Sequence, residues 1–154
     1  METFSNRCSV VPVIVDELPN PRLSHHSHAT VVGNLIFVSG LVSQPDSDGA
    51  RPGVLRSDDG PVHDVSLQLN SIFQQLDVIL QECNSQRELV VDVQVFLRDL
   101  KLDFEIMNES YKTYFGLHMP SRTTVEVVRF PSEVAVEIKV IAAVNQSINR
   151  EVTI

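Results

Sequence analysis

Arg122 and Glu137 are the residues of this sequence whose chemistry is most suggestive, because each stands among the apolar residues of a predicted strand. Residues 120–130 read PSRTTVEVVRF and residues 134–141 read VAVEIKVI, and both segments alternate with the period of two that is typical of β-strands. An arginine can bind a planar carboxylate through two parallel hydrogen bonds, and a glutamate can orient or deprotonate a water molecule. The pair therefore predicts half of a hydrolytic site for a small acid.

A simpler interpretation of the same pair is a solvated sheet face, on which an exposed charge contributes about 0–1 kcal/mol to stability. If the two strands formed a direct hairpin, Arg122 and Glu137 would lie about 20 Å apart along it and could not share a site. Two alternatives follow for a site that uses both residues. Either the strands are not direct neighbours, or the site joins different chains.

The elements that must position this pair follow from hydrophobic periodicity and turn residues. In chain order they are strands over residues 28–32 and 35–39, a helix over 64–83, a strand over 90–97, a helix over 103–115, and the two strands of the 120–141 segment. Gly33-Asn34 favours a two-residue hairpin between the first two strands, and Asp64 and Asn84 are expected to begin and end the first helix. Residues 41–62 are rich in glycine, proline and aspartate, which predicts a long loop.

This order predicts an α+β two-layer sandwich in which two helices cover one face of a single mixed β-sheet. The 154 residues form one domain by size, with a weakly patterned segment at 1–26, in which 10–15 could be an edge strand, and a polar tail at 145–154. We expect the second sheet face to be half apolar and covered by another subunit. The residues expected on that face are Arg122, Thr124, Val128, Phe130, Glu137, Lys139, Ile141 and Ala143.

Composition narrows the classes of function. The formal net charge of −8 argues against nucleic acid as a partner, because phosphate binding requires a basic patch. Cys8 and Cys83 are too few for a disulfide framework, so we expect a reducing compartment. No apolar run approaches the roughly 20 residues that span a membrane, and the start has no leader pattern. We therefore expect a cytoplasmic protein without a membrane partner.

Three neighbouring histidines, His25, His26 and His28, raise the question of a metal site. No carboxylate or cysteine stands at a matching spacing, so no metal is predicted. The simpler interpretation is a partly exposed segment before a strand, and His26 at the edge of a cleft is the other alternative. The helix residues expected in the core are Cys83, Met107, Tyr111 and Phe115.

Several segments, in register, resemble the reactive intermediate deaminases, also called the RidA/YjgF family. They are VGNLIFVSG (32–40), Gln68 in the first helix, VVDVQVFLRDL (90–100), DFEIMNESYKTYF (103–115), and PSRTTVEVVRFP (120–131) followed by VEIKVIA (136–142). The resemblance extends from residue 28 to residue 143. It implies a chorismate mutase-like fold, a homotrimer with clefts between neighbouring subunits, and hydrolysis of reactive enamines and imines to ammonia and a 2-oxo acid without cofactor or metal.

The resemblance also implies roles for particular residues. Arg122 matches the arginine that binds the substrate carboxylate, and Glu137 matches the acid that holds the attacking water. The substrate-binding residues implied in addition are His26, Ser39, Gly40, Asn108, Thr123, Thr124 and Pro131. Departures from the family pattern are His26, where many members carry a tyrosine, and Thr124, where some carry a cysteine.

Three functions remain open from the sequence. The long 41–62 loop and the pair His28-Ala29 are more similar to the 2-aminomuconate deaminase branch, whose substrate has a second carboxylate that Arg51 or Arg56 could meet; solvated loop arginines are the simpler interpretation. The second function is a non-catalytic trimer that binds small carboxylates. The third is the endoribonuclease or translation inhibitor activity described for some members, which the charge of −8 opposes.

Overall fold

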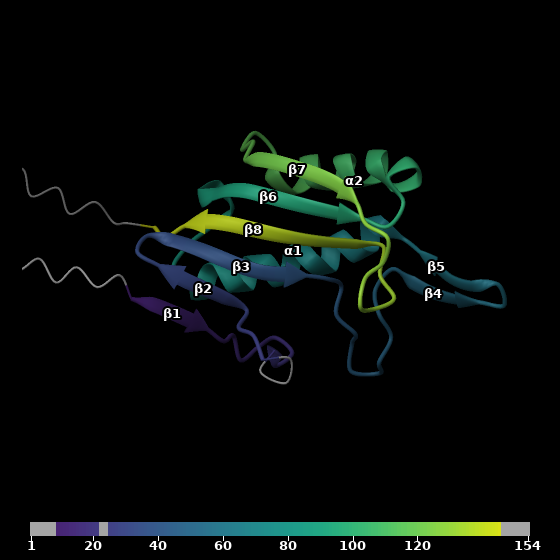
Figure 1. Ribbon diagram of the computed structural model, residues 1–154, viewed down its shortest axis with the longest axis horizontal. Coiled ribbons are helices and arrows are strands. Elements are labelled where there is room, and N and C mark those ends of the chain that lie inside the picture. Colours follow the sequence, from purple (N-terminus) through teal and green to yellow (C-terminus); the bar gives the residue numbers. More distant parts are fainter. Residues whose placement is uncertain (1–8, 22–24, 146–154) are drawn as a thin grey trace, which may run out of the picture.

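The computed structural model describes residues 9–21 and 25–145, and the structural statements below concern these residues. They form two layers: a six-stranded mixed β-sheet with two helices packed on one of its faces (Figure 1). This confirms the predicted α+β sandwich. Cys8 and residues 146–154 of the predicted polar tail lie outside the described residues.

The sheet has the strand order β1-β2-β3-β8-β6-β7, and only β6 and β7 are parallel neighbours. Its strands are β1 (Val10–Val13), β2 (Ala29–Val32), β3 (Leu35–Leu41), β6 (Val90–Leu97), β7 (Ser121–Glu126) and β8 (Val136–Ala143). The helices are α1 (Val65–Glu82) and α2 (Leu100–Phe115), and a 3₁₀ turn, η2 (Arg87–Leu89), precedes β6. In Figure 1 both helices lie behind the sheet, with β7 and β1 at its two edges.

The helix ends follow from local side-chain chemistry. The Asp64 carboxylate accepts a hydrogen bond from the Leu67 amide at 3.0 Å, and Asn84 has a φ of 52°, so α1 begins and ends as predicted. The second helix begins at Leu100 instead of residue 103. The reason is that Asp99 caps it, accepting a hydrogen bond from the Leu102 amide at 2.9 Å.

The prediction of an uninterrupted loop over residues 41–62 is wrong for its second half. Residues 54–63 form a separate hairpin of β4 (Val54–Ser57) and β5 (Gly60–His63). Both strands are short, and the apolar side chains of Leu55 and Val62 are exposed, so the segment has no core-facing alternation that the sequence could reveal. Backbone pairing holds the hairpin, and the Ser57 hydroxyl donates a hydrogen bond to the Gly60 carbonyl across its turn at 2.6 Å.

The core lies between the sheet and α1. Alternate residues of β8 from Val136 to Ala142 are buried, and they pack with a stripe of α1 at helical spacing. The α1 residues of this stripe are Leu69, Ile72, Leu76, Ile79 and Leu80. Cys83, Met107 and Phe115 are buried as predicted, while Tyr111 is only partly buried against the core.

The two strands that carry the candidate residues are not direct neighbours, because β6 lies between β7 and β8. Arg122 pairs with Val93, which pairs with Val140, and both valines are buried under the helices. Paired residues of neighbouring strands share a face, so Arg122 points toward the helix side of the sheet. Glu137 pairs with Phe96 on the opposite, uncovered face.

The prediction that Arg122 and Thr124 share the uncovered face with Glu137 is therefore wrong. A period of two shows which residues of a strand share a face, but it does not show which face the helices cover. At the edge strand β7 the apolar Val125 points to the uncovered face and the polar set points to α2. Lys139, Ile141 and Ala143 lie on the uncovered face as predicted, whereas Val128 and Phe130 follow the end of β7 and belong to the connection to β8.

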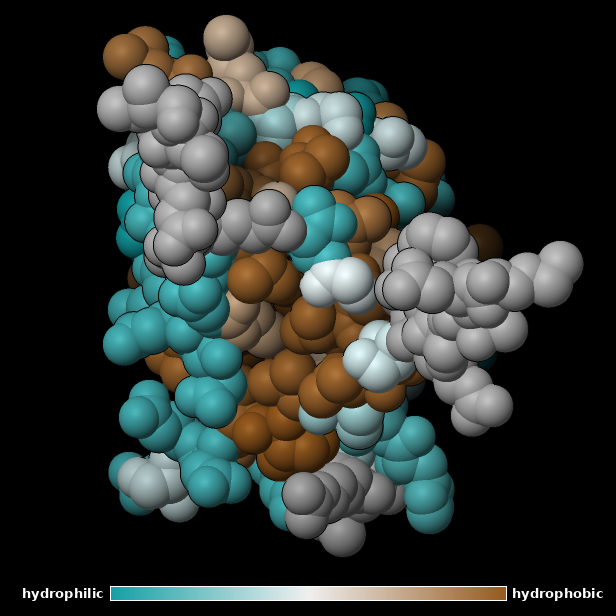
Figure 2. Space-filling view, turned by 90° about the vertical axis from the view of Figure 1, so that its left-hand side faces the viewer, coloured by the Kyte–Doolittle hydropathy of each residue, from teal (hydrophilic) through white to brown (hydrophobic). Residues whose placement is uncertain are grey.

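Part of the apolar surface stays exposed in the subunit. Figure 2 views the end of the molecule where β3 and β6 begin and β8 ends, and apolar side chains there form a connected patch beside hydrophilic margins. Exposed apolar residues of these strands include Leu35, Phe37 and Val91. Contiguous apolar surface of this kind marks interaction sites. That another subunit covers this surface remains a prediction.

Gln68 of α1 forms hydrogen bonds to the residues that directly precede β4 and β8. Its side chain has no solvent exposure; Nε2 donates to the Gly53 carbonyl at 2.9 Å, and Oε1 accepts from the Ala135 amide at 2.9 Å. The substitution Gln68→Leu would leave both backbone groups without this partner, so we expect it to lower the free energy of unfolding by about 2–4 kcal/mol. Urea titration measures this loss. Gln74→Leu, at an exposed position of the same helix, is the matched control, and equal losses for the two variants would contradict the prediction.

Candidate functional site

Glu137 and Gly40 are in direct contact on the uncovered face. The pairing of β3 with β8 shifts between Val38 and Leu41, which places Gly40 in an irregularity next to β8. A Cβ atom added at Gly40 would overlap the Glu137 Oε1 atom, so a side chain here would displace the carboxylate from its present position. The Glu137 carboxylate is half-buried, and this burial raises its pKa above that of an ordinary glutamate.

A small cavity lies beside this contact. Its volume is about 170 Å³, and three predicted site residues, His26, Ser39 and Gly40, line it together with residues of the 19–21 segment, His28, Leu41, Gln44 and Gln75. The Ser39 hydroxyl donates a hydrogen bond to the Ser27 carbonyl at 2.7 Å, which holds the segment that carries His26 against β3. Gly40 therefore both lines the cavity and contacts the Glu137 side chain.

His28 has a structural role in this wall. It is 7% exposed, and its Nδ1 accepts a hydrogen bond from the Val15 amide at 2.9 Å. Because Nδ1 is an acceptor, Nε2 carries the proton and donates to the Pro19 carbonyl at 3.1 Å. Within residues 9–21 and 25–145, no group of three or more histidine, cysteine, aspartate or glutamate side chains could hold a metal ion.

Arg122 lies at the other end of the sheet, between β7 and α2. Its guanidinium carbon is 4.7 Å from the centroid of the Tyr111 ring, and NH1 is 3.7 Å from the Met107 sulfur. The ion pairs of the described part of the chain are Arg56 with Glu133 and Arg87 with Asp77, so Arg122 has no carboxylate partner there. A guanidinium held by two neutral groups keeps its full charge for an anionic ligand.

Two buried hydroxyl groups near Arg122 are unsatisfied. The Tyr111 hydroxyl and the Thr124 Oγ1 have no hydrogen-bond partner among the described residues. Burial raises the pKa of Tyr111 to about 12, so its hydroxyl stays protonated at neutral pH. Unpaired buried polar groups are rare in folded proteins and are typical of functional regions. The sequence assigned Tyr111 to the core and missed its contact with Arg122; the signal was its position four residues after Met107, on the same face of α2.

The other predicted residues are Asn108, Thr123 and Pro131. Asn108 is half-buried on α2 directly after Met107, and Thr123 pairs with Gln94, which turns its side chain to the uncovered face. Pro131 is exposed in the connection between β7 and β8. The structure thus brings His26, Ser39 and Gly40 together at the small cavity, and Gly40 also contacts Glu137. Thr124 lies on the same face of β7 as Arg122, whereas Thr123 and Pro131 do not.

Within one subunit the two groups do not meet. Arg122 and Glu137 are separated by two strand spacings and by three residues along the strands, roughly 14 Å between Cα atoms, and their side chains leave opposite faces. The strands are indeed not direct neighbours, yet this does not bring the two side chains together. A single site that uses both residues therefore requires a second chain.

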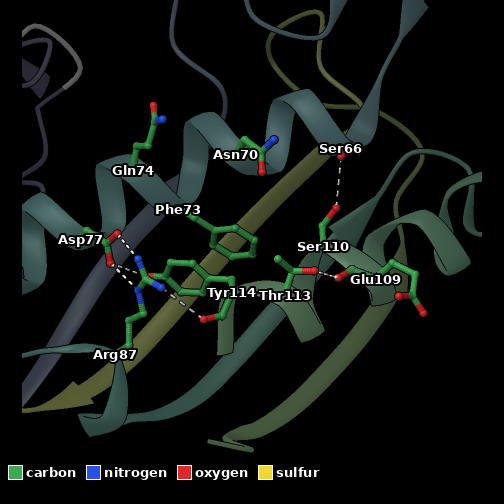
Figure 3. A pocket seen from close by; sticks show the side chains of 10 residues that line it. All are labelled: Ser66, Asn70, Phe73, Gln74, Asp77, Arg87, Glu109, Ser110, Thr113 and Tyr114. Atoms are coloured by element: carbon green, nitrogen blue, oxygen red, sulfur yellow. Dashed lines mark hydrogen bonds and ion pairs between the residues drawn. The ribbon is translucent and has the colours of Figure 1, made fainter. Parts of the chain in front are cut away.

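A cavity with a volume of about 560 Å³ lies elsewhere, between α1 and α2 (Figure 3). At one end, Asp77 accepts hydrogen bonds from Arg87 and from the Tyr114 hydroxyl, the latter at 2.6 Å, and Arg87 lies over the Tyr114 ring. Tyr114 in turn stacks on Phe73 at 4.0 Å between ring centroids. Because these groups bond one another, we interpret this end as packing between the helices. None of the predicted site residues lines this cavity.

The loop arginines differ in their surroundings. Arg56 forms a 3.7 Å ion pair with Glu133, and both side chains are exposed. This agrees with the simpler interpretation of Arg56 as a solvated loop arginine. Arg51 is half-buried and donates a hydrogen bond to the Ser43 carbonyl, and burial lowers its pKa while Glu133 acts in the opposite direction. Of the two arginines, Arg51 is the better candidate to meet a second substrate carboxylate, because its side chain is held at Ser43, close to the end of β3.

Comparison with known proteins identifies the family of this chain. The family model for endoribonuclease L-PSP matches residues 19–144. The chain is 34% identical over 131 residues to a RutC family protein of Pyrococcus abyssi, covering 84% of this chain and 94% of the relative. It is also 34% identical over 136 residues to protein HMF1 of Saccharomyces cerevisiae, covering 88% and 95%.

Solved structures share the fold. Yeast Mmf1 superimposes with a TM-score of 0.71 at 30% identity, covering 89% of this chain and 100% of that chain. The YjgF gene product of E. coli superimposes with a TM-score of 0.72 at 26% identity, covering 86% and 98%. The two-layer subunit fold is thus shared with these proteins. The chain belongs to the endoribonuclease L-PSP family, which is the RidA/YjgF family, and the resemblance seen in the sequence is confirmed.

The raised pKa of Glu137 predicts a particular dependence of stability on pH. Between the unfolded and the folded pKa of this carboxyl, the folded protein binds more protons, so its stability falls as the pH rises through the folded value. Glu137→Gln cannot ionise, and we expect it to gain stability relative to the wild type between about pH 4 and about pH 7.

Chemical denaturation of both proteins at the two pH values measures this difference. Glu105→Gln, an exposed glutamate of α2, controls for the loss of one negative charge. The same stability difference between Glu137→Gln and the wild type at both pH values would show that Glu137 is not responsible.

Proposed function

We propose that this protein hydrolyses small reactive 2-imino and 2-enamino acids, releasing ammonia and a 2-oxo acid. The observation that carries the proposal is the guanidinium of Arg122, which is held by Tyr111 and Met107 and has no carboxylate partner in the described part of the chain. Membership of the RidA/YjgF family is consistent with imine deamination in general. The half-buried Glu137 supplies a second group suited to hydrolysis.

Each residue has a role that its surroundings support. Arg122 binds the 2-carboxylate of the substrate in a two-pronged contact. Glu137 accepts a proton from a water molecule while the water oxygen bonds to the electrophilic imine carbon, and it returns the proton to the nitrogen. Glu137 next moves the hydroxyl proton of the resulting carbinolamine to the same nitrogen while the C–N bond breaks, so the carbonyl forms and ammonia leaves. A glutamate whose pKa lies above the ordinary value is better matched to both proton transfers near neutral pH.

The proposal includes a homotrimer with its active sites in clefts between neighbouring subunits. It is supported by the distance between Arg122 and Glu137 within one chain, by their opposite faces, and by the exposed apolar patch of Figure 2. In such a cleft one subunit contributes Glu137 with Ser39, Gly40 and His26. Its neighbour contributes Arg122, and the residues expected with it are Asn108, Thr123, Thr124 and Pro131.

The substrate class can be narrowed by experiment. 2-Aminomuconate is one candidate, because Arg51 is half-buried beside Ser43 and could meet a second carboxylate. A trimer that binds small carboxylates without catalysis is the alternative, and Glu137 argues against it because simple binding needs no buried acid. An endoribonuclease activity, as in the description of the family model, is opposed by the net charge of −8.

Activity measurements test the proposal directly. We expect ammonia release from an enzymatically generated 2-imino acid, and we expect Arg122→Ala and Glu137→Gln each to lower kcat/KM about 100-fold or more, because one loses the carboxylate contact and the other the proton acceptor. Gln74→Leu, away from both groups, is the control. A wild-type rate equal to the uncatalysed rate for 2-imino acids and for 2-aminomuconate alike would favour the binding alternative. Saturable binding of single-stranded RNA at physiological salt would favour the endoribonuclease alternative.

The subunit cleft makes a separate prediction. If Arg122 and Glu137 act from different chains, mixing the inactive Arg122→Ala and Glu137→Gln subunits should rebuild some complete clefts. After unfolding and joint refolding at equal concentrations, roughly a quarter of the clefts in a closed ring carry both native residues, so about a quarter of the wild-type activity is expected. The variants refolded separately and then combined are the control. No recovery in properly mixed trimers would place both residues in the same chain's site.

A further inference from the structure

The exposed Arg122 side chain is held by two neutral groups. A carboxylate partner would also fix a guanidinium, but it would cancel the charge that a ligand needs. Here an aromatic ring face and a thioether hold it: the Tyr111 centroid lies 4.7 Å from the guanidinium carbon, and the Met107 sulfur lies 3.7 Å from NH1. Both groups are neutral, so they restrict the side chain without competing with a ligand.

The two supporting residues are placed by α2. Met107 has no solvent exposure, and Tyr111 follows it by four residues, so both project from the same face of the helix toward β7. Tyr111 packs in turn on Phe115, with 4.5 Å between the ring centroids. The ring that lies against Arg122 is thus part of a packed aromatic pair and has little freedom to move.

We propose that Tyr111 is a positioning residue for the candidate site: the face of its ring holds the Arg122 guanidinium in the orientation that binds the substrate carboxylate. This inference rests on the proposed function. It assigns to Tyr111 an effect on substrate affinity that acts through Arg122 and involves no contact with the reacting atoms.

Loss of the Tyr111 ring and loss of the Tyr111 hydroxyl are expected to have different effects on the site. The hydroxyl is buried and has no hydrogen-bond partner among the described residues, so in this subunit it contributes nothing to holding Arg122 and carries the cost of an unpaired polar group. The ring supplies the attraction between its π electrons and the cation. Removing the hydroxyl should therefore preserve the site, and removing the ring should weaken it.

Two substitutions at one position separate these contributions. For Tyr111→Phe we expect a KM within about twofold of the wild type and a stability that is equal or higher. For Tyr111→Leu we expect KM to rise about 3- to 30-fold while kcat changes by less than about threefold, because a cation and an aromatic face lose their attraction but Glu137 is untouched. If Tyr111→Leu does not fold, Tyr111→Met, which is apolar and flexible, takes its place.

Tyr114→Phe is the matched control on the same helix. The Tyr114 hydroxyl donates to Asp77 at 2.6 Å, and its ring lies near Arg87, so its loss should lower stability and leave KM unchanged. A purely structural role of Tyr111 would produce the same pattern as this control. A rise in KM for Tyr111→Phe as large as for Tyr111→Leu would show that the hydroxyl, and not the ring, serves the site, and would overturn the proposal.

A binding measurement keeps this test distinct from that of the catalytic function. Calorimetric titration with a 2-oxo acid, the class of the expected product, gives a Kd for each variant whether or not the protein is catalytic. The inference predicts a Kd that is raised for Tyr111→Leu and restored in Tyr111→Phe. If this Kd pattern is found without ammonia release, the deaminase function alone is rejected. If ammonia is released and Tyr111→Leu leaves KM and Kd unchanged, the role of Tyr111 alone is rejected.

Discussion

The pairing of β8 with both β3 and β6 is the constraint on which the rest of the structure depends. The last strand of the described residues, β8, occupies the middle of the sheet, so the sheet is complete only when segments from both halves of the sequence have come together. Its alternation serves two purposes at once. Residues from Val136 to Ala142 close the core against α1, and the intervening Glu137 is pressed against Gly40, where burial raises the pKa of its carboxyl.

The candidate site consists of groups that are poorly compensated within the subunit. Glu137 is a half-buried acid, Arg122 is a cation without a carboxylate partner in the described part of the chain, and the hydroxyls of Tyr111 and Thr124 are unpaired there. The burial of the Glu137 carboxyl and of the two unpaired hydroxyls costs stability in an isolated subunit, whereas Arg122 is exposed. A protein retains such groups where a ligand or a neighbouring chain supplies the missing partner, which is the logic of a site between subunits.

Much of the fold could be predicted because its signals are local. The Asp64 cap, the left-handed Asn84, the Gly33-Asn34 hairpin and the stripe of α1 each depend on residues a few positions apart. The sequence does not predict the β4–β5 hairpin because the apolar side chains of its strands are exposed, so the segment lacks a core-facing alternation. The predicted start of α2 is three residues late, because the predicted span begins after the Asp99 cap and its hydrogen bond to the Leu102 amide.

The sequence by itself determined the family, the two-layer class and the residue types of the site, because these follow from motifs and periodicity along the chain. Only the tertiary structure decided where those residues lie. The order β8-β6-β7 separates Glu137 from Arg122 and puts them on opposite faces, and α2 brings Tyr111 and Met107 under the guanidinium. Strand order and face assignment depend on contacts between residues distant in sequence, and a period of two is identical for a strand and for the same strand turned over.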